Sequence, residues 1–234
     1  MYMSEIWRYP VKSMAGEQLE EAMLRPLGIP GDREFVVMNR PGRIVSARER
    51  PRLLRMRATR NPDDVVRVDG LDWQDAEVAR RVRAAAGPDA LLTRLAGAER
   101  FDIMPLTVTS DGAIAALGVD HRRLRPNLVL GGVPGLAERA WEGMFLALGD
   151  AVIGLADLRG RCIMTTWDPE SGAQDLGVLR RIQDEFEGVF ALNAWVARPG
   201  HVARGAPVTL LDRFDEAAIP PLGRFARRER SPRS

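Results

Sequence analysis

The sequence predicts an α+β protein that is mainly β and carries a few peripheral helices. Short apolar runs alternate with turn residues over residues 1–60, and such runs return throughout the second half of the chain. Helical spacing of apolar residues is confined to three short segments. With 234 residues and 45% hydrophobic residues, the chain is long enough for one or two domains with a buried core.

A first domain is expected over residues 1–100 and opens with β-structure. Apolar patterning predicts a strand at residues 35–38, a turn at 39–42 and a returning strand at 43–46. Strand-like character resumes at 91–95.

One helix is expected between these strands. Asp72 is a suitable N-cap, and Gly87 followed by Pro88 ends the helical pattern. The apolar residues at helical spacing are Val78, Val82 and Ala85.

A second domain, also mainly sheet, is expected over residues 101–212. Ser110 is positioned to cap a helix that ends at Gly118. The Gly149-Asp150 pair predicts a hairpin between residues 144–148 and 151–155. A further helix is predicted at 176–187, and further strands are predicted at 127–130, 189–196 and 208–211. Residues 213–234 are expected to form a flexible C-terminal extension, because the end from Phe225 is polar and basic.

Charge and cysteine content narrow the functional classes. The 34 Lys and Arg residues are balanced by 32 Asp and Glu residues, so no nucleic-acid partner is expected. A single cysteine excludes an intramolecular disulfide and fits a reducing compartment. The N-terminus lacks a signal-peptide pattern and the longest apolar stretch, 144–156, is too short to span a bilayer. We therefore expect a cytoplasmic protein without membrane association.

Common catalytic motifs are absent from the sequence. Two histidines, His121 and His201, lie far apart, and there is no CxxC pair, HExxH, P-loop, GxSxG or GxGxxG pattern. The remaining candidate for a functional residue is Cys162, in the segment RCIMTTWDPESG. This segment is predicted to form an apolar strand that ends near Thr166, before a turn. Arg159 and Arg161 favour a thiolate, which attacks electrophiles or binds soft metals. A small buried hydrophobic residue is the alternative interpretation, and the residues alone leave both open.

Five stretches in a fixed order resemble a known family. They are YPVKSMAGE at 9–17, GDREFVVMNRPGRIVSARERPRLL at 31–54, RPNLVL at 125–130, RCIMTTWDPESG at 161–172 and ARPGHVARGAPVTLL at 197–211. The last three are similar to the MOSC domain. The first two are similar to the β-barrel domain that precedes MOSC in the mitochondrial amidoxime reducing component and its bacterial relatives. The resemblance implies an N-terminal β-barrel domain followed by a MOSC β-barrel domain, with molybdenum held by molybdopterin between them.

The resemblance also assigns roles to matched residues. Cys162 would be the catalytic thiolate and the metal ligand. Lys12 and Ser13 would contact the phosphate or pterin edge of the cofactor, Lys12 as a point charge. Arg33 and Arg48 would offer forked donors to phosphate or pterin oxygens, although arginines of such a chain are otherwise mostly solvated.

Further cofactor contacts are implied in the second half of the chain. Ser110 would donate to the pterin from a helix start, and simple helix capping is an equally good interpretation. Arg125 and Asn127 would face the cofactor from a strand entrance, joined by Arg161 and Thr165 beside the cysteine. Thr165 and Thr166 alternate faces on the expected strand, so only one of them should point to the site.

Two positions depart from the family pattern. Gly160 stands where amidoxime-reducing relatives often have serine, and Ala206 stands where many relatives have aspartate. The particular substrate therefore does not transfer by analogy.

The leading functional hypothesis is a molybdenum-cofactor-dependent reductase of N-hydroxylated compounds or oxides. A single cysteine cannot hold an iron–sulfur cluster, so a separate electron donor is implied, such as a ferredoxin or a flavin or haem reductase. One alternative is a sulfurtransferase or sulfur carrier that uses a Cys162 persulfide. Another is a non-catalytic carrier of the molybdenum cofactor.

Overall fold

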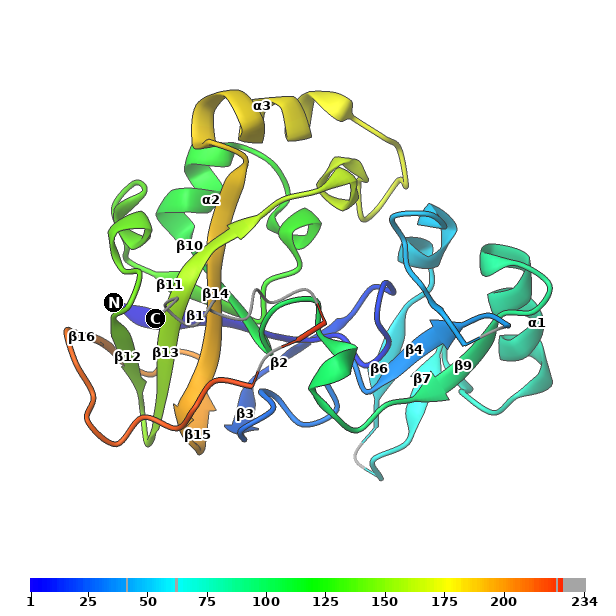
Figure 1. Ribbon diagram of the computed structural model, residues 1–234, viewed down its shortest axis with the longest axis horizontal. Coiled ribbons are helices and arrows are strands. Elements are labelled where there is room, and N and C mark those ends of the chain that lie inside the picture. The colour runs from blue at the N-terminus through cyan, green and yellow to red at the C-terminus, as the bar shows by residue number, and fades with distance from the viewer. Residues whose placement is uncertain (41, 62, 222, 225–234) are drawn as a thin grey trace, which may run out of the picture.

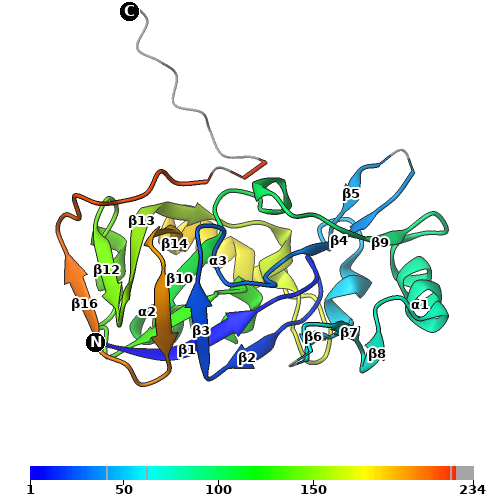
Figure 2. The ribbon, with the colours of Figure 1, turned by 90° about the horizontal axis from the view of Figure 1, so that it is seen from below.

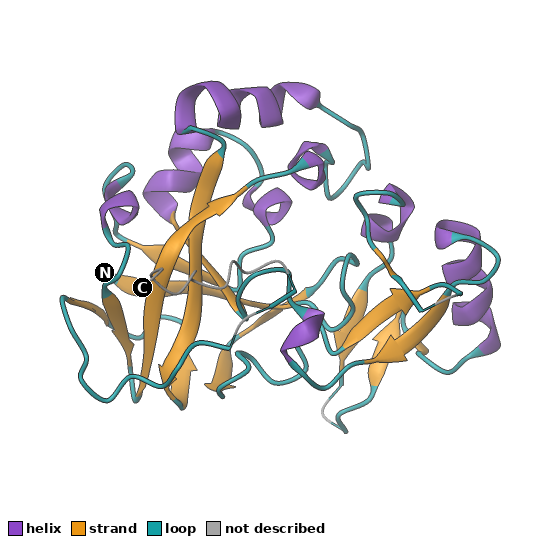
Figure 3. Cartoon of the chain, viewed as in Figure 1, coloured by secondary structure: helices purple, strands orange, loops and turns teal. Residues whose placement is uncertain are grey.

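The computed structural model describes residues 1–40, 42–61, 63–221 and 223–224. This part of the chain is mainly β with three α-helices, so the predicted mainly β, α+β class is confirmed (Figure 3). No helix in the described ranges is both long and apolar enough to cross a membrane. Residues 225–234, most of the extension expected to be flexible, lie outside the described residues.

An eight-stranded sheet forms the larger part of the molecule (Figure 1). Its strands, in spatial order, are β16 (Val208–Leu211), β12 (Phe145–Leu148), β13 (Ala151–Gly160), β14 (Val189–Arg198), β10 (Leu106–Ser110), β11 (Leu128–Gly131), β1 (Tyr2–Arg8) and β2 (Glu17–Leu19). The β12–β13 pair is the predicted hairpin, in which Leu148 lies opposite Ala151. Neighbouring strands are antiparallel except for the parallel pair β10–β11.

The N-terminal strand β1 belongs to this sheet and pairs with β11 from the second half of the chain. An isolated bridge between Tyr2 and Pro207 also links β1 to the segment that leads into β16. The bridge brings the two ends of the sheet towards each other. Beside it, β3 (Glu21–Leu24) pairs with β15 (Gly200–Ala203).

Two three-stranded sheets lie with α1 (Ala76–Ala86) at the other end of the molecule (Figure 2). One contains β5 (Ile44–Val45), β4 (Phe35–Met38) and β9 (Leu91–Arg94). The other contains β6 (Ala58–Arg60), β7 (Val66–Val68) and β8 (Leu71–Asp72). Their buried side chains form a core separate from that of the large sheet.

Helix α1 begins later than predicted. Asp72 lies in β8, and the N-cap is Asp75, whose side chain accepts a hydrogen bond from the Glu77 backbone at 2.7 Å. The prediction was wrong here because Asp72 and Asp75 are both suitable helix caps in the sequence. Only the pairing of Asp72 with Arg67 of β7 assigns Asp72 to a strand.

The other two helices follow the prediction closely. Ser110 caps α2 (Asp111–Leu117), which ends at the left-handed Gly118. Helix α3 (Leu176–Phe186) is capped by Asp175 and ends before Gly188, whose N–H donates to Ile182 at 2.9 Å. Both helices cover one end of the large sheet around Phe186 and Phe190.

Five short 3-10 helices complete the described structure. They are η1 (Pro51–Arg55), η2 (Ala98–Arg100), η3 (His121–Leu124), η4 (Ala137–Ala140) and η5 (Ile163–Thr166). Of these, η3 and η5 position residues of the candidate site.

Candidate functional site

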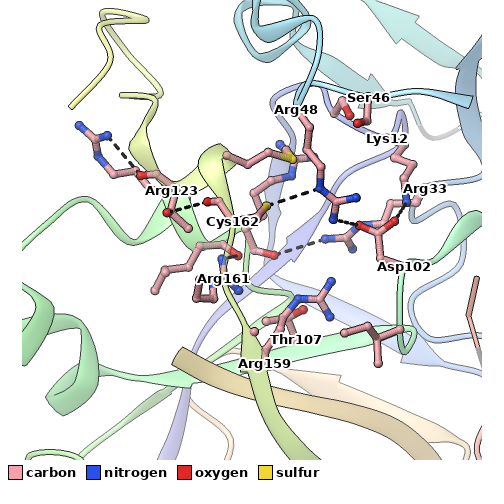
Figure 4. Close-up of a pocket in the computed structure, with 17 residues that line it drawn as sticks. Lys12, Arg33, Ser46, Arg48, Asp102, Thr107, Arg123, Arg159, Arg161 and Cys162 are labelled. Atoms are coloured by element: carbon pink, nitrogen blue, oxygen red, sulfur yellow. Dashed lines mark hydrogen bonds and ion pairs between the residues drawn. The ribbon is translucent and has the colours of Figure 1, made fainter. Parts of the chain in front are cut away.

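A cavity of about 170 Å³, called here the cysteine cavity, brings both halves of the chain together around Cys162 (Figure 4). The smaller sheets and their loops contribute one group of lining residues, namely Lys12, Ser13, Arg33, Ser46 and Arg48. The second half contributes another group, which includes Thr107, Arg123, Arg125, Arg159, Gly160, Arg161, Cys162, Met164 and Thr165. Asp102, from the connection between the halves, lies between the two groups.

Cys162 lies where strand β13 gives way to η5. The strand ends at Gly160, and the extended Cys162 backbone precedes the first turn of η5. The Cys162 carbonyl accepts hydrogen bonds from the Thr165 backbone N–H at 3.0 Å and from Thr165 Oγ1 at 2.9 Å. Residues 162–166 are therefore not the strand that was predicted. The threonine hydroxyls bond to carbonyls three residues earlier, a local option that competes with strand pairing.

The thiol is joined to a short chain of charged groups. Arg48 Nε donates to Cys162 Sγ at 3.5 Å, and Arg48 Nη2 donates to Asp102 Oδ2 at 2.9 Å. The other oxygen, Asp102 Oδ1, accepts from Lys12 Nζ at 2.8 Å, and Lys12 also donates to the Arg100 carbonyl at 2.9 Å. One carboxylate thus holds two cations beside the cysteine.

Electrostatics keep this carboxylate ionised. Burial alone would raise the pKa of Asp102, but Lys12 and Arg48 attract its charge and lower the pKa to about 2. Burial lowers the pKa of Lys12 to about 8 despite the attraction of Asp102. For Arg48, burial opposes the charged form, yet the bond to Cys162 and the charge of Asp102 leave its pKa raised.

Positive charge dominates the lining of the cysteine cavity. Seven lining residues are cationic, and Asp102 is the only carboxylate among the lining residues. The cations are Lys12, Arg33, Arg48, Arg123, Arg125, Arg159 and Arg161. Arg33 and Arg123 have carboxylate partners outside the cavity, Asp32 and Asp168.

Three of these arginines make no ion pair with a carboxylate anywhere in the described chain: Arg125, Arg159 and Arg161. Burial lowers the pKa of Arg125 and Arg159 to about 10 and that of Arg161 to about 9, so all three remain charged at neutral pH. Arg125 Nη2 and Arg161 Nε are also buried without a hydrogen-bond partner among the described residues. Buried donors and charges of this kind require an acceptor, which an anionic ligand would supply.

Backbone conformation adds a separate indication of function. Ser13, Arg33 and Arg125 all line the cavity and have left-handed φ angles of 72°, 53° and 55°. Such conformations are unfavourable for residues other than glycine and tend to occur at functional sites. Ser13 Oγ accepts from the Ala47 backbone at 2.9 Å, which leaves its hydroxyl hydrogen available to a ligand.

Eight of the ten predicted site residues line the cysteine cavity. They are Lys12, Ser13, Arg33, Arg48, Arg125, Arg161, Cys162 and Thr165. Ser110 and Asn127 do not. The Ser110 hydroxyl is occupied by the cap of α2 and by Glu138, at 3.1 and 2.9 Å. Asn127 lies behind the lining, where its Oδ1 accepts from Arg33 Nη1 at 3.1 Å and so orients that guanidinium.

Several lining residues were not predicted as part of the site. Arg159 was expected only as a charge beside the thiol. It lies near the end of β13, two residues before Arg161, and this spacing in an extended chain would place both side chains on one face. Arg123 occurs in the same short segment as Arg125, which was the available signal. Asp102 carries no local signal, because its partners Lys12 and Arg48 are 90 and 54 residues away.

The two departures from the family pattern occupy different places. Gly160 lines the cavity, and a Cβ atom there would meet no atom within 4 Å, so a serine would fit. Ala206 is not among the lining residues. Its carbonyl accepts from the Met3 backbone at 2.9 Å, beside the bridge that joins β1 to the segment before β16.

The donor set indicates how a metal could be held. The described residues contain no group of three or more His, Cys, Asp or Glu side chains suited to a metal ion. A metal at Cys162 would therefore take most of its ligands from a bound organic group, and the surrounding cations fit a group that carries phosphate.

Two family profiles match the two halves of the chain. The profile of the MOSC N-terminal β-barrel domain matches residues 1–102, and the profile of the MOSC domain matches residues 105–209. Mitochondrial amidoxime-reducing component 1 of Mus musculus is 24% identical over 280 residues, which cover 89% of this chain and 82% of that protein. Mitochondrial amidoxime reducing component 2 of Bos taurus is 26% identical over 231 residues, which cover 74% and 68%.

Two solved structures show a distant likeness. The YUAD protein from Bacillus subtilis superposes with a TM-score of 0.45 at 16% identity, covering 89% of this chain and 94% of that chain. YiiM from Escherichia coli superposes with a TM-score of 0.41 at 16% identity, covering 90% and 72%. The two domain profiles, in the order expected from the five sequence stretches, show that the chain belongs to the MOSC-domain family and carries the N-terminal MOSC β-barrel domain.

Proposed function

We propose that this protein is a molybdenum-cofactor-dependent reductase that removes oxygen from N-hydroxylated compounds or oxides. The observation that carries the proposal is the cationic cysteine cavity, in which Arg125, Arg159 and Arg161 have no carboxylate partner in the described ranges. A phosphate-bearing pterin would balance this charge, and Cys162 would provide a soft ligand to its metal. The amidoxime-reducing names of the mouse and cattle relatives support the choice of substrate.

The residues divide into two groups around such a cofactor. Lys12, Ser13 and Arg33 would bind the phosphate, since they combine a point charge, a hydroxyl donor and a planar fork. Arg125 and Arg161, with Thr165 beside them, would donate to the polar edge of the pterin through the groups that lack partners in the described chain. Ser110 and Asn127 would act indirectly, through α2 and through Arg33.

The protein groups around Cys162 would position its sulfur for ligation of the metal. When bound, the molybdenum centre supplies the two-electron redox chemistry that no side chain of the protein provides. Arg48 donates to Cys162 Sγ and would hold the sulfur in position for ligation. Asp102 remains ionised because its pKa is about 2, so it orients Lys12 and Arg48 as an acceptor and does not serve as an acid at neutral pH.

The overall reaction balances with an external source of electrons. An amidoxime takes up two electrons and two protons, its N–O bond breaks, and an amidine and one water molecule are released. The sequence contains no haem, flavin or iron–sulfur motif. The electrons would come from a separate donor protein, such as a ferredoxin or a flavin or haem reductase.

Metal and pterin analysis of the wild type and of Cys162→Ala tests this proposal. We expect about one molybdenum and one pterin per wild-type chain, and reduction of benzamidoxime with a chemical electron donor. The variant should lose activity while its unfolding temperature changes little, because Cys162 contributes no core contact. Unchanged activity in Cys162→Ala would refute the proposal.

The same samples separate the two alternatives. A sulfur carrier would contain labile sulfur on Cys162 without molybdenum. A cofactor carrier would contain molybdenum and pterin but reduce no amidoxime, hydroxylamine or sulfoxide.

A further inference from the structure

A second cavity of about 330 Å³ adjoins the cysteine cavity, and we call it the tryptophan cavity. The two cavities share Arg123, Arg125 and Met164 as lining residues. Residues near η1 line one side of it and residues after η5 line the other, and these segments lie opposite each other in Figure 1. A molecule bound in this cavity would therefore lie next to the site that contains Cys162.

The tryptophan cavity is strongly cationic. Five arginines line it, namely Arg55, Arg57, Arg122, Arg123 and Arg125, against the single carboxylate of Glu170. Glu170 is paired with Arg122 at 2.5 Å. Arg55 and Arg57 are exposed and make no ion pair within the described part of the chain. Two guanidinium groups are thus available to a negatively charged ligand.

Buried polar atoms without partners lie in the same wall. Tyr9 is 2% exposed, and its hydroxyl has no hydrogen-bond partner among the described residues. Arg123 Nε is also buried without a hydrogen-bond partner among the described residues. Burial raises the pKa of Tyr9, so its hydroxyl keeps its proton. Because unsatisfied buried donors are rare in folded proteins, these two atoms indicate a ligand with acceptor atoms.

Aromatic side chains in the wall of the tryptophan cavity favour ligands of a particular shape. Trp7 and Trp167 both line it, and Met164 adds an apolar contact. Trp7 is fixed by a bond from its Nε1 to Glu5 at 2.6 Å and stacks on Tyr9 with 6.4 Å between ring centroids. Two tryptophans within a cationic cavity favour a flat aromatic molecule that also carries negative charge.

We propose that the tryptophan cavity binds the non-reacting end of the substrate, and that the substrates are flat aromatic N-hydroxylated compounds bearing a carboxylate or phosphate group. The aromatic ring would contact Trp7 and Trp167, and the anionic group would meet Arg55 and Arg57. The inference rests on the proposed reductase function. It adds a substrate class that the cysteine cavity does not define.

Kinetics of the cofactor-loaded protein test the inference with three compounds: benzamidoxime, its 4-carboxy derivative and its 4-phosphono derivative. With a chemical electron donor, we expect the preferred anionic compound to have a KM about tenfold below that of benzamidoxime, as one charge-assisted hydrogen bond would give. The two derivatives distinguish a carboxylate from a phosphate ligand. Double substitution Arg55→Ala and Arg57→Ala should remove most of this advantage. Arg213→Ala, which removes an exposed arginine outside both cavities, should preserve it.

Binding without turnover provides a second readout. Benzoate and phenylphosphonate should quench tryptophan fluorescence of the cofactor-loaded protein, and Trp167→Leu should reduce the quenching while the unfolding temperature shows that the variant is folded.

Equal KM values for the neutral and anionic amidoximes would overturn the inference and leave the reductase proposal intact. Quenching seen only after removal of the cofactor would also overturn it, because the cofactor would then occupy the cavity. If no amidoxime is reduced, the reductase proposal fails, and absence of quenching in the same samples would show that the cavity binds no aromatic anion either.

Discussion

At the scale of single residues, Asp102 connects the two halves of the site. It accepts from Lys12 through one oxygen and from Arg48 through the other, and Arg48 reaches Cys162. The Asp102 side chain is only 17% exposed, so both interactions are largely shielded from water. Loss of this carboxylate would leave two cations without their shared partner.

Asp102→Asn should lower the free energy of unfolding by about 2 kcal/mol at pH 7, from the lowering of the carboxyl pKa on folding. The folded pKa is about 2 and the ordinary value is 3.8. The stabilisation is therefore complete above about pH 4 and is lost as the pH falls towards 2. Urea unfolding of the wild type and of Asp102→Asn at pH 7 and pH 3 measures this stabilisation. A difference between wild type and variant that does not shrink at pH 3 would contradict this account.

Arg48 is expected to act on catalysis through its bond to the thiol. Arg48→Lys keeps the charge but cannot contact Cys162 and Asp102 with one planar fork. We expect activity on benzamidoxime, or molybdenum content, to fall by about 10- to 100-fold, as for other residues that support a metal ligand. Arg43→Lys, at an exposed arginine outside the cysteine cavity, is the matched control. Equal activity of the two variants would argue against a role for Arg48.

Residues predicted from a short motif with its own sequence context lie together in the structure. Lys12, Arg48 and Cys162 lie in stretches whose order along the chain resembles the family, and all three line one cavity. Ser110 shows the limit of this reasoning, since capping and cofactor binding require the same residue type at a helix start. Asp102 could not be found from local pattern, because only the tertiary fold brings it to Lys12 and Arg48.

At the scale of elements, α2 depends on Ser110 at its start. The Ser110 hydroxyl accepts from the Ala113 backbone and donates to the buried Glu138. Burial raises the pKa of Glu138, which shows that its ionised form is poorly solvated there. The serine therefore serves the helix and a buried carboxyl group at once.

Ser110→Ala should destabilise the protein by about 2 kcal/mol, from the lost cap and the unsatisfied Glu138. Cofactor content should stay at the wild-type level, because Ser110 does not line the cysteine cavity. Asp175→Ala removes the equivalent cap of α3 and is expected to cost about 1 kcal/mol. Loss of molybdenum in Ser110→Ala without a comparable loss in Asp175→Ala would contradict this expectation and support a direct contact between Ser110 and the pterin.

Element boundaries were predictable where glycine or a capping residue marks them. The end of α2 at Gly118 and the turn of the β12–β13 hairpin at Gly149 both have left-handed glycines. The segment after Cys162 was predicted as strand because Ile163, Thr165 and Thr166 favour sheet. It forms η5 because side-chain and backbone bonds to earlier carbonyls replace strand pairing.

At the scale of the whole molecule, the charge is balanced overall but uneven in space. The chain has a formal net charge of +2, yet seven cations and one carboxylate line the cysteine cavity. The sequence composition could not reveal this, because the cations come from segments far apart in the chain. Folding concentrates them, and the concentration favours a multiply charged anion.

Pyrophosphate should therefore stabilise cofactor-free protein. At about 100 times its dissociation constant, the gain should be about 2.7 kcal/mol, or an increase in Tm of about 5–10 °C for a chain of this length. Thermal unfolding in sodium chloride of the same ionic strength is the control. An equal shift in chloride would show general screening and would contradict a specific anion site.

The proposed function depends on ligation of molybdenum by Cys162, which X-ray absorption at the molybdenum edge measures. Wild-type protein and Cys162→Ser would be compared after loading with the same cofactor and checking that each is folded. We expect one sulfur fewer in the first coordination shell of molybdenum in the variant. The same number of sulfur ligands in both proteins would contradict it.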